Sequence, residues 1–292
     1  TITIAPNTIN RMQFIENGTS GSQNIIISQG SGANVTIAPG NVKAVYLDGA
    51  GSGAAVTDAF ASLSVGAIND ITSKAFGTSS IMIGDTTTGT ISAANYNVGL
   101  GVDVFAALTT GDNNVAVGFG ALDANTTASV NTAVGSNALG ANISGQQNVA
   151  VGANSLDANT TGGDNVAVGT GALGANTTAA SNTAVGHLAL TANTTGTGHA
   201  ALGQSALAAN TTGTNNTGLG QVSLTANTTG ASNVAVGRAA LTANTTGDNN
   251  TAVGMNAMVA NTTGTDNVAV GAASLDANTT GAENTAVGKS SL

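Results

Sequence analysis

The chain has 292 residues, 41 of them glycine, and its 14 acidic and 5 basic residues give a formal net charge of −9. The absence of cysteine excludes a disulfide scaffold and a cysteine-rich zinc site. Five basic residues and 2% aromatics exclude the basic, stacking surface that nucleic acids need. With 41% apolar and 7% charged residues the composition is the reverse of a disordered one, so we expect a thin, repeated core of small side chains.

The N-terminal segment 1–66 carries no repeat and is predicted to be a small β-rich module, for attachment or as one bead of a longer fibre. Short strands separated by glycine- and proline-containing turns are expected at residues 1–5, 12–16, 24–28 and 34–38. A short helix is expected at residues 54–63. Residues 67–96 are predicted to be a transition with degenerate coils.

A 17-residue repeat fills residues 97–292. The string Asn-(Val or Thr)-Ala-Val-Gly recurs every 17 residues from Asn114 to Asn284, with His199 in place of asparagine once. We number the positions of the unit 1 to 17 from this asparagine. Position 5 is always glycine, position 9 is leucine except for Met258, and position 12 is always asparagine. A strict period with fixed variable positions indicates stacked, equivalent coils.

The period predicts an all-β parallel β-solenoid, or β-roll. Helical repeats need about 33 residues per unit, and β-branched residues and glycine recur in every unit here. We expect each coil to contain a strand at Asn-Val-Ala-Val-Gly, a glycine turn, a second short strand around Ala-Leu-x-Ala and an Asn-Thr-Thr-Gly corner. At about 4.8 Å per coil, twelve coils make a rod roughly 58 Å long.

Three repeated positions are predicted to hold the stack together. The corner asparagines are expected to form a ladder in which each amide bonds its neighbour one coil away. The corresponding residues are the asparagines Asn125, Asn142, Asn159, Asn176, Asn193, Asn210, Asn227, Asn244, Asn261 and Asn278, the leucines Leu122, Leu139, Leu156, Leu173 and Leu190, and the glycines Gly118, Gly135, Gly152 and Gly169. No catalytic, cofactor-binding or metal-binding residue is predicted.

The repeated strand is apolar on both of its faces. Position 3 is alanine except for Gly218, position 4 is valine or leucine, and neighbouring residues of a strand point to opposite sides. An isolated solenoid needs an apolar inner face only, whereas strands that are apolar on both faces are buried on both. We therefore expect the rods to pack along their length, intertwined or side by side, as a homotrimer.

The repeated polar residues fit glycosylation, ice binding and calcium binding less well than a structural role. The Asn-Thr-Thr triplets match N-glycosylation sequons, but glycans about 4.8 Å apart would crowd. Adjacent threonines such as Thr126 and Thr127 point to opposite sides of a strand, which argues against an ice-binding face. His187 and His199 are expected to be surface or ladder substitutions. Calcium needs 6–8 converging oxygens per ion, and the acidic residues are too scattered for that: Asp112, Asp123, Asp157, Asp164, Asp248, Asp266, Asp276 and Glu283.

The unit Asn-(Val/Thr)-Ala-Val-Gly-x-x-Ala-Leu resembles the repeats in the heads of trimeric autotransporter adhesins, whose shorter units form a left-handed parallel β-roll in a trimer. The full unit, Thr-Ala-Val-Gly-x-x-Ala-Leu-x-x-Asn-Thr-Thr-Gly-x-x-Asn, is more similar to repeats in tail fibres and other virion proteins of marine bacteriophages, over residues 80–292. Residues 14–60, which begin FIENGTSGSQNIIISQG, resemble a small β module that recurs in virion proteins of these phages.

These resemblances imply a non-enzymatic fibre shaft of a bacteriophage virion, an extracellular appendage that positions host-attachment parts. The expected partners are other copies of the chain, other virion proteins and a host-surface glycan, with no nucleic acid, membrane insertion or cofactor. Phage tailspikes that cut polysaccharide use paired carboxylates and aromatic platforms, whereas this chain has five Phe, two Tyr and no Trp. The alternatives are a bacterial surface adhesin of the trimeric autotransporter kind and an ice-binding solenoid.

Overall fold

The structure is a computed structural model that describes residues 1–3, 10–18, 23–29, 31–48, 50, 55–58, 73–76, 80–84 and 93–292. The chain divides into two compact units, Thr1–Ile71 and Thr72–Leu292. Every regular element in the described ranges is a β-strand. No helix among these residues is long and apolar enough to cross a membrane.

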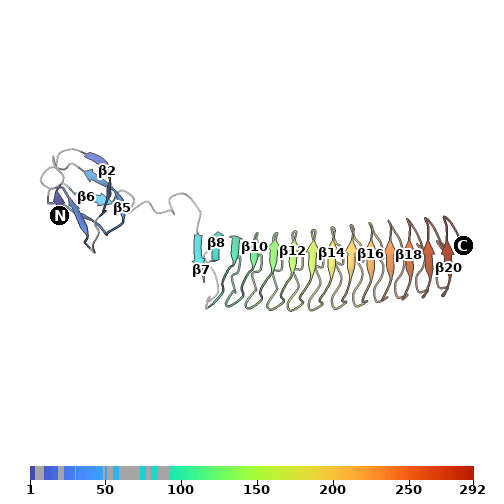
Figure 1. Ribbon diagram of the computed structural model, residues 1–292. Helices are drawn as coiled ribbons and strands as arrows, with labels where there is room; N and C mark the ends of the chain where they lie inside the picture. The colour runs from blue at the N-terminus through green and yellow to red at the C-terminus, as the bar shows by residue number, and fades with distance from the viewer. Residues whose placement is uncertain are drawn as a thin grey trace. The chain divides into compact units, whose positions relative to one another are not determined.

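The first unit contains two three-stranded sheets (Figure 1). One sheet has the order β1 (Ile2–Thr3), β3 (Ile25–Ser28), β4 (Val35–Ile37), and the other has the order β2 (Asn10–Glu16), β5 (Val42–Asp48), β6 (Val56–Asp58). One apolar cluster takes side chains from strands of both sheets: Ile27, Val35, Ile37, Val45, Leu47 and Val56. The described part of this unit is thus a pair of small sheets around a shared core.

The prediction of a helix at residues 54–63 is wrong for the part of that segment that the structure describes. Residues Val56–Asp58 form strand β6, which pairs antiparallel with β5. Val56 and Thr57 are β-branched and favour strands, and Val56 is buried against the cluster. The remainder of the expected helix, apart from Ala55, lies outside the described residues.

The second unit is built around one 14-stranded sheet. Strand β7 (Ser73–Phe76) is antiparallel to β8 (Ser80–Gly84), and from β8 onward every pairing is parallel, starting with β9 (Val98–Gly101). The following strands are β10 (Val115–Val117), β11 (Thr132–Val134), β12 (Val149–Val151), β13 (Val166–Val168), β14 (Thr183–Val185), β15 (Ala200–Leu202), β16 (Thr217–Leu219), β17 (Val234–Val236), β18 (Thr251–Val253), β19 (Val268–Val270) and β20 (Thr285–Val287). The repeat region of this unit is therefore a parallel β-solenoid with one strand per 17-residue coil.

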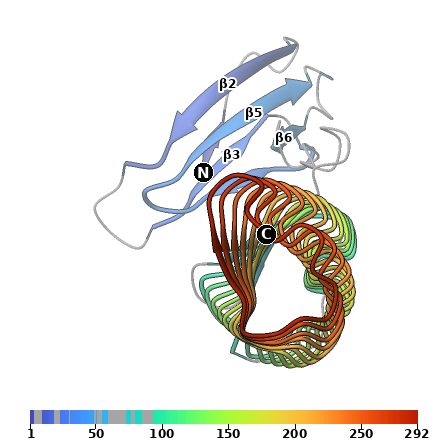
Figure 2. The same ribbon diagram turned by 90° about the vertical axis from the view of Figure 1, so that its right-hand side faces the viewer.

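Successive coils lie in strict register. Val149 of β12 pairs with Val166 of β13, 17 residues later, and the same spacing holds along the whole parallel run. The strands stack in a single row, and a view along that row shows the coils superimposed on a common outline (Figure 2). Each side chain of the repeat consequently lies next to its equivalent in the neighbouring coil.

The second strand expected in each coil, around Ala-Leu-x-Ala, is absent from the described repeats. Positions 7 and 9 adopt left-handed backbone conformations, for example Asn137 (φ 55°) and Leu139 (φ 51°). Peptide groups then alternate in direction: the Leu139 amide donates to the next coil at Ser155 (3.0 Å), and the Asn137 amide donates to the previous coil at Phe119 (2.8 Å). A left-handed leucine costs about 1–2 kcal/mol, which complete burial of its side chain, worth about 1.5–3 kcal/mol, offsets.

Position 5 admits only glycine. Gly135 has φ +141°, and a Cβ atom placed on it would lie 2.5 Å from the carbonyl oxygen of Gly152 in the next coil. Gly118 and Gly169 repeat this geometry with their own neighbours. The glycines predicted to matter are thus the points where two coils approach each other backbone to backbone.

The solenoid interior is a column of small apolar side chains from positions 3, 8 and 9, such as Ala150, Ala172 and Leu173. The first full coil differs, because Phe105 and Leu108 stand where later coils have leucine and asparagine. Gly99 replaces the position-3 alanine there, since a Cβ atom would lie only 3.0–3.2 Å from Val104, Met82 and Phe105. Larger apolar side chains thus fill this end of the column.

Candidate functional site: the asparagine ladders and the outer sheet face

The asparagines at position 12 form a hydrogen-bonded ladder inside the solenoid. Asn159 Nδ2 donates to Asn142 Oδ1 of the previous coil (2.9 Å) and to the carbonyl of Gly162 in its own coil (2.9 Å). The inter-coil bond recurs at every step up to Asn278. Asn125, at the start, bonds instead to the backbone of Ala128 in its own coil. Buried amides are therefore paired along the corner, as buried polar groups must be.

A second ladder runs along position 1, which sequence reasoning missed. Asn131 Oδ1 accepts from the backbone amide of Asn148 (2.9 Å), and Asn131 Nδ2 donates to Asn114 Oδ1 (3.2 Å) and to the carbonyl of Gly145 (3.0 Å). The signal was present in the sequence. The eleven repeats that begin at residues 114 to 284 are the clear copies of the unit, and ten of them begin with asparagine. The side-chain oxygen at position 1 thus takes the place of a backbone acceptor between coils.

The corner threonines have two different environments. Thr160 Oγ1 donates to the carbonyl of Thr177 in the next coil (3.1 Å), and the amides of Thr160 and Thr161 donate to the same oxygen (2.8 and 3.3 Å). Thr160 is half-buried and Thr161 is exposed. The Asn-Thr-Thr corner therefore has a structural role at its first threonine and presents only the second to solvent.

The outer face of the sheet consists of positions 2 and 4. On β13 the buried Ala167 lies between Val166 and Val168, which are half-buried on the opposite side, and most repeat strands share this pattern. Positions 2 and 4 carry no charged residue from β9 to β20. Five position-2 residues are threonines whose hydroxyls bond to no residue that the structure describes: Thr132, Thr183, Thr217, Thr251 and Thr285. A strip of valine, leucine and threonine therefore faces outward along the sheet.

The acidic residues bridge coils singly. Asp112 Oδ1 accepts from the amide of Asn95 and Asp248 Oδ1 from that of Ala231, both at 2.7 Å. Burial raises the pKa of Asp123, with a further contribution from the charge of Asp103, and burial also raises the pKa of Asp157. Within the described ranges no three His, Asp or Glu side chains gather in a way that could hold a metal ion.

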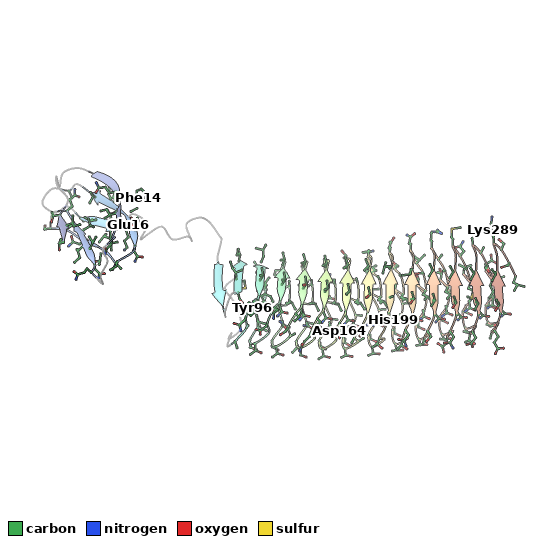
Figure 3. All side chains as sticks on the ribbon, in the orientation of Figure 1. Phe14, Glu16, Tyr96, Asp164, His199 and Lys289 are labelled. Atoms are coloured by element: carbon green, nitrogen blue, oxygen red, sulfur yellow. The ribbon has the colours of Figure 1, made fainter. Side chains whose placement is uncertain are left out.

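The two histidines lie in different environments. His187 is exposed at position 6, whereas His199 stands at position 1 of its coil and is 3% exposed. The His199 amide donates to Asn182 Oδ1 (3.1 Å), and its Nδ1 accepts from the amide of Asn216 (3.2 Å), so the imidazole continues the second ladder (Figure 3).

The two asparagine ladders hold neighbouring coils together, and positions 2 and 4 of the sheet form an outward apolar strip. Comparisons with models of protein families, with curated proteins and with solved structures found no match. The function of the protein is therefore inferred from the geometry of its coils and from the resemblances of its sequence.

Proposed function

We propose that the repeat region is the shaft of a homotrimeric structural fibre of a bacteriophage virion, which extends and positions host-attachment parts. The observation that carries the proposal is the outer face of the β9–β20 sheet, whose positions 2 and 4 are apolar or threonine in every coil. A solenoid that stays alone in water has no need of valine on that face, and a second copy of the chain is the simplest cover for it.

The size of the strip supports self-association. Twelve strands about 4.8 Å apart, with side chains covering a width of about 10 Å, give a strip of roughly 600 Å² on each copy. Standard interfaces bury about 1,200–2,000 Å² in total, and two such strips together reach the lower end of that range. The chain carries a net charge of −9, and its acidic residues lie outside positions 2 and 4, so charge repulsion is weakest where these strips meet.

A threefold arrangement is the closed form in which each strip contacts both neighbours around one axis. The resemblance of the repeats to trimeric adhesin heads favours the same number. The resemblance of residues 14–60 and 80–292 to virion proteins of marine bacteriophages supports the location, with other virion proteins and a host-surface glycan as proposed partners.

The proposed work is mechanical. Hydrogen bonds join adjacent coils at the strand, the glycine turn and the corner, for example from Val166 to Asn182 (2.8 Å), from Gly169 to Val151 (2.7 Å) and from Thr160 to Thr177 (2.8 Å). Bending such a rod requires stretching several columns of bonds together. Stiffness therefore follows from the repeat without any specialised site.

The test is the mass of the purified protein by light scattering, together with negative-stain images of the same sample. We expect three times the 27.8 kDa chain mass, on rods several nanometres long. Val168→Asp, which places a charge on the outer face, should give a folded monomer, whereas Thr161→Asp at the exposed corner should leave the assembly intact. A wild-type monomer would contradict the fibre.

The virion location needs its own test. Peptides of the chain should be present in phage particles purified by density gradient from the source of the sequence, and particles without them would contradict that location even if the trimer forms. Ice binding is a second candidate because of the threonine hydroxyls on the outer face. A monomeric rod that shows thermal hysteresis would favour it over the fibre.

A further inference from the structure

His199 is the one residue in the position-1 ladder, among the clear copies, that changes its charge near neutral pH. Its imidazole lies within the stack, between the coil that begins at Asn182 and the coil that begins at Asn216. Figure 3 labels it in the middle part of the row of coils. Any change in its protonation therefore acts on the contact between two coils.

Nδ1 of the neutral imidazole reproduces the acceptor of the asparagine that it replaces. Elsewhere Oδ1 accepts the amide of the next position-1 residue, and here Nδ1 accepts the amide of Asn216 at 3.2 Å. Elsewhere Nδ2 donates to the carbonyl at position 15, and here that carbonyl, of Gly213, accepts from Asn210 Nδ2, which lies 3.1 Å from Nε2 of the ring. Because Nδ1 accepts the Asn216 amide, the neutral ring carries its proton on Nε2.

We propose that His199 is an acid-sensitive joint in the solenoid: protonation of Nδ1 replaces the bond to the Asn216 amide by a contact between two donors and loosens the stacking of the coils that begin at His199 and Asn216. An asparagine side chain has no protonated form near neutral pH. The device is therefore confined to one coil of the repeat, and it holds for a single chain as well as for an assembly.

The surroundings offer no charge to stabilise an imidazolium. The groups that face the ring come from Asn182 before β14, from Asn216 before β16, and from the corners at residues 193–196 and 210–213. They are amides, hydroxyls and backbone groups, and none of them titrates. Asn210 Nδ2, 3.1 Å from Nε2, already donates to Asn193 Oδ1 and to Gly213. Protonation thus leaves a buried positive charge without a partner.

The sign of the pH dependence follows from burial. Burial lowers the pKa of His199 below its ordinary value, although the backbone groups of Gly213 and Asn216 oppose this shift. When the contact between the coils that begin at His199 and Asn216 opens, the imidazole is exposed to water. Below pH about 6.5 the exposed ring takes up a proton that the buried ring in the closed stack does not accept. The closed state is therefore fully favoured above this pH and loses stability as the pH falls toward the lowered pKa of the ring.

The packing of the same two coils also departs from the repeat. Gly218 replaces the position-3 alanine, and the outward position 4 holds Leu202 and Leu219 where the other clear copies have valine. The methyl group that Gly218 lacks belongs to the column of buried alanines on either side, Ala201 and Ala235. The coil that begins at Asn216, on one side of the contact that His199 controls, thus has the least apolar filling at position 3 among the clear copies.

Amide hydrogen exchange followed by NMR tests the proposal. Between pH 7.5 and 5.5, after correction for intrinsic exchange, protection of the Asn216 amide should fall by up to about tenfold per pH unit below 6.5. The amide of Asn250, which donates to Asn233 Oδ1 at 2.9 Å, is the internal control and should keep its protection. His199→Asn, which restores the common residue, should remove the pH dependence, and His187→Asn should retain it.

The proposal is overturned if the Asn216 amide keeps constant protection in the wild-type chain, or if His199→Asn shows the same pH dependence. Nitrogen chemical shifts of the histidine rings give a second measurement on the unaltered protein. A proton on Nδ1 at pH 7.5, or a His199 ring that titrates above pH 6.5, would equally contradict it.

Discussion

Asn148 and Asn159 belong to different ladders of the same coil, and both donate to the carbonyl of Gly162, each at 2.9 Å. The shared acceptor closes the polar corner of the coil, because one backbone oxygen receives the amide at position 1 and the amide at position 12. The pairing repeats through the stack, for example at Gly230 with Asn216 and Asn227. The two ladders therefore act as one buried network.

Removal of one amide in mid-stack should be costly. Asn159→Ala leaves Asn176 Nδ2 without its acceptor and Asn142 Oδ1 without its donor. We expect a loss of about 2–4 kcal/mol, since buried polar groups that lose a partner keep their desolvation cost. Urea unfolding followed by circular dichroism measures it. Asn125→Ala is the matched control: Asn125 bonds only to Ala128, so a loss as large as that of Asn159→Ala would contradict the ladder as the source.

The backbone contact at position 5 gives a second prediction. Gly135→Ala should destabilise the solenoid by more than about 3 kcal/mol, because the new Cβ meets the Gly152 carbonyl at 2.5 Å and the residue has φ +141°. At Gly140→Ala the nearest atoms would lie 3.4 Å away, in ordinary contact, and φ is not in the left-handed region. This variant should melt at or slightly above the wild-type temperature. Equal melting temperatures for the two variants would refute the steric argument.

The period of 17 residues, with glycine at position 5 and asparagine at position 12, is sufficient to predict a parallel solenoid with small buried side chains. Sequence reasoning failed where a residue type does not reveal its backbone conformation. Leucine seldom adopts positive φ, yet Leu139 does so because its amide reaches Ser155 in the next coil. The expected second strand was therefore wrong, and the reason lies in contacts between coils.

The role of His199 shows the same limit at the level of one side chain. Histidine and asparagine differ in shape, but Nδ1 of His199 accepts the Asn216 amide as an asparagine side-chain oxygen would. A substitution in the ladder was one expectation for this residue. The identity of its partners depends on the coil above and the coil below, which the sequence alone does not place.

The leucine column provides a test of the interior. Leu173 is fully buried, and Leu173→Ala should cost about 2–5 kcal/mol, as large-to-small core substitutions do. Leu173→Asp should cost more, because the carboxylate enters a column of alanine and leucine. Thr170→Asp, exposed in the same coil, is the control and should change the melting temperature little. If Leu173→Asp melted like the wild-type chain, the assignment of position 9 to the core would be incorrect.

A last prediction concerns Asp157, at position 10. Burial raises the pKa of its carboxyl, although hydrogen bonds from its own amide and from that of Ala158 oppose the shift. A group whose pKa is raised by folding contributes stability below its unfolded pKa, and that contribution is lost as the pH rises through the folded pKa. The charged carboxylate therefore weakens the coil at pH 7.

Asp157→Asn should raise the melting temperature at pH 7, and the gain should vanish at pH 3, where the wild-type carboxyl is protonated. Asp164→Asn removes a charge at an exposed position and is the control for net charge. A gain from Asp157→Asn that persists at pH 3 would mean that the amide forms better hydrogen bonds, and that burial of the charge is not the cause.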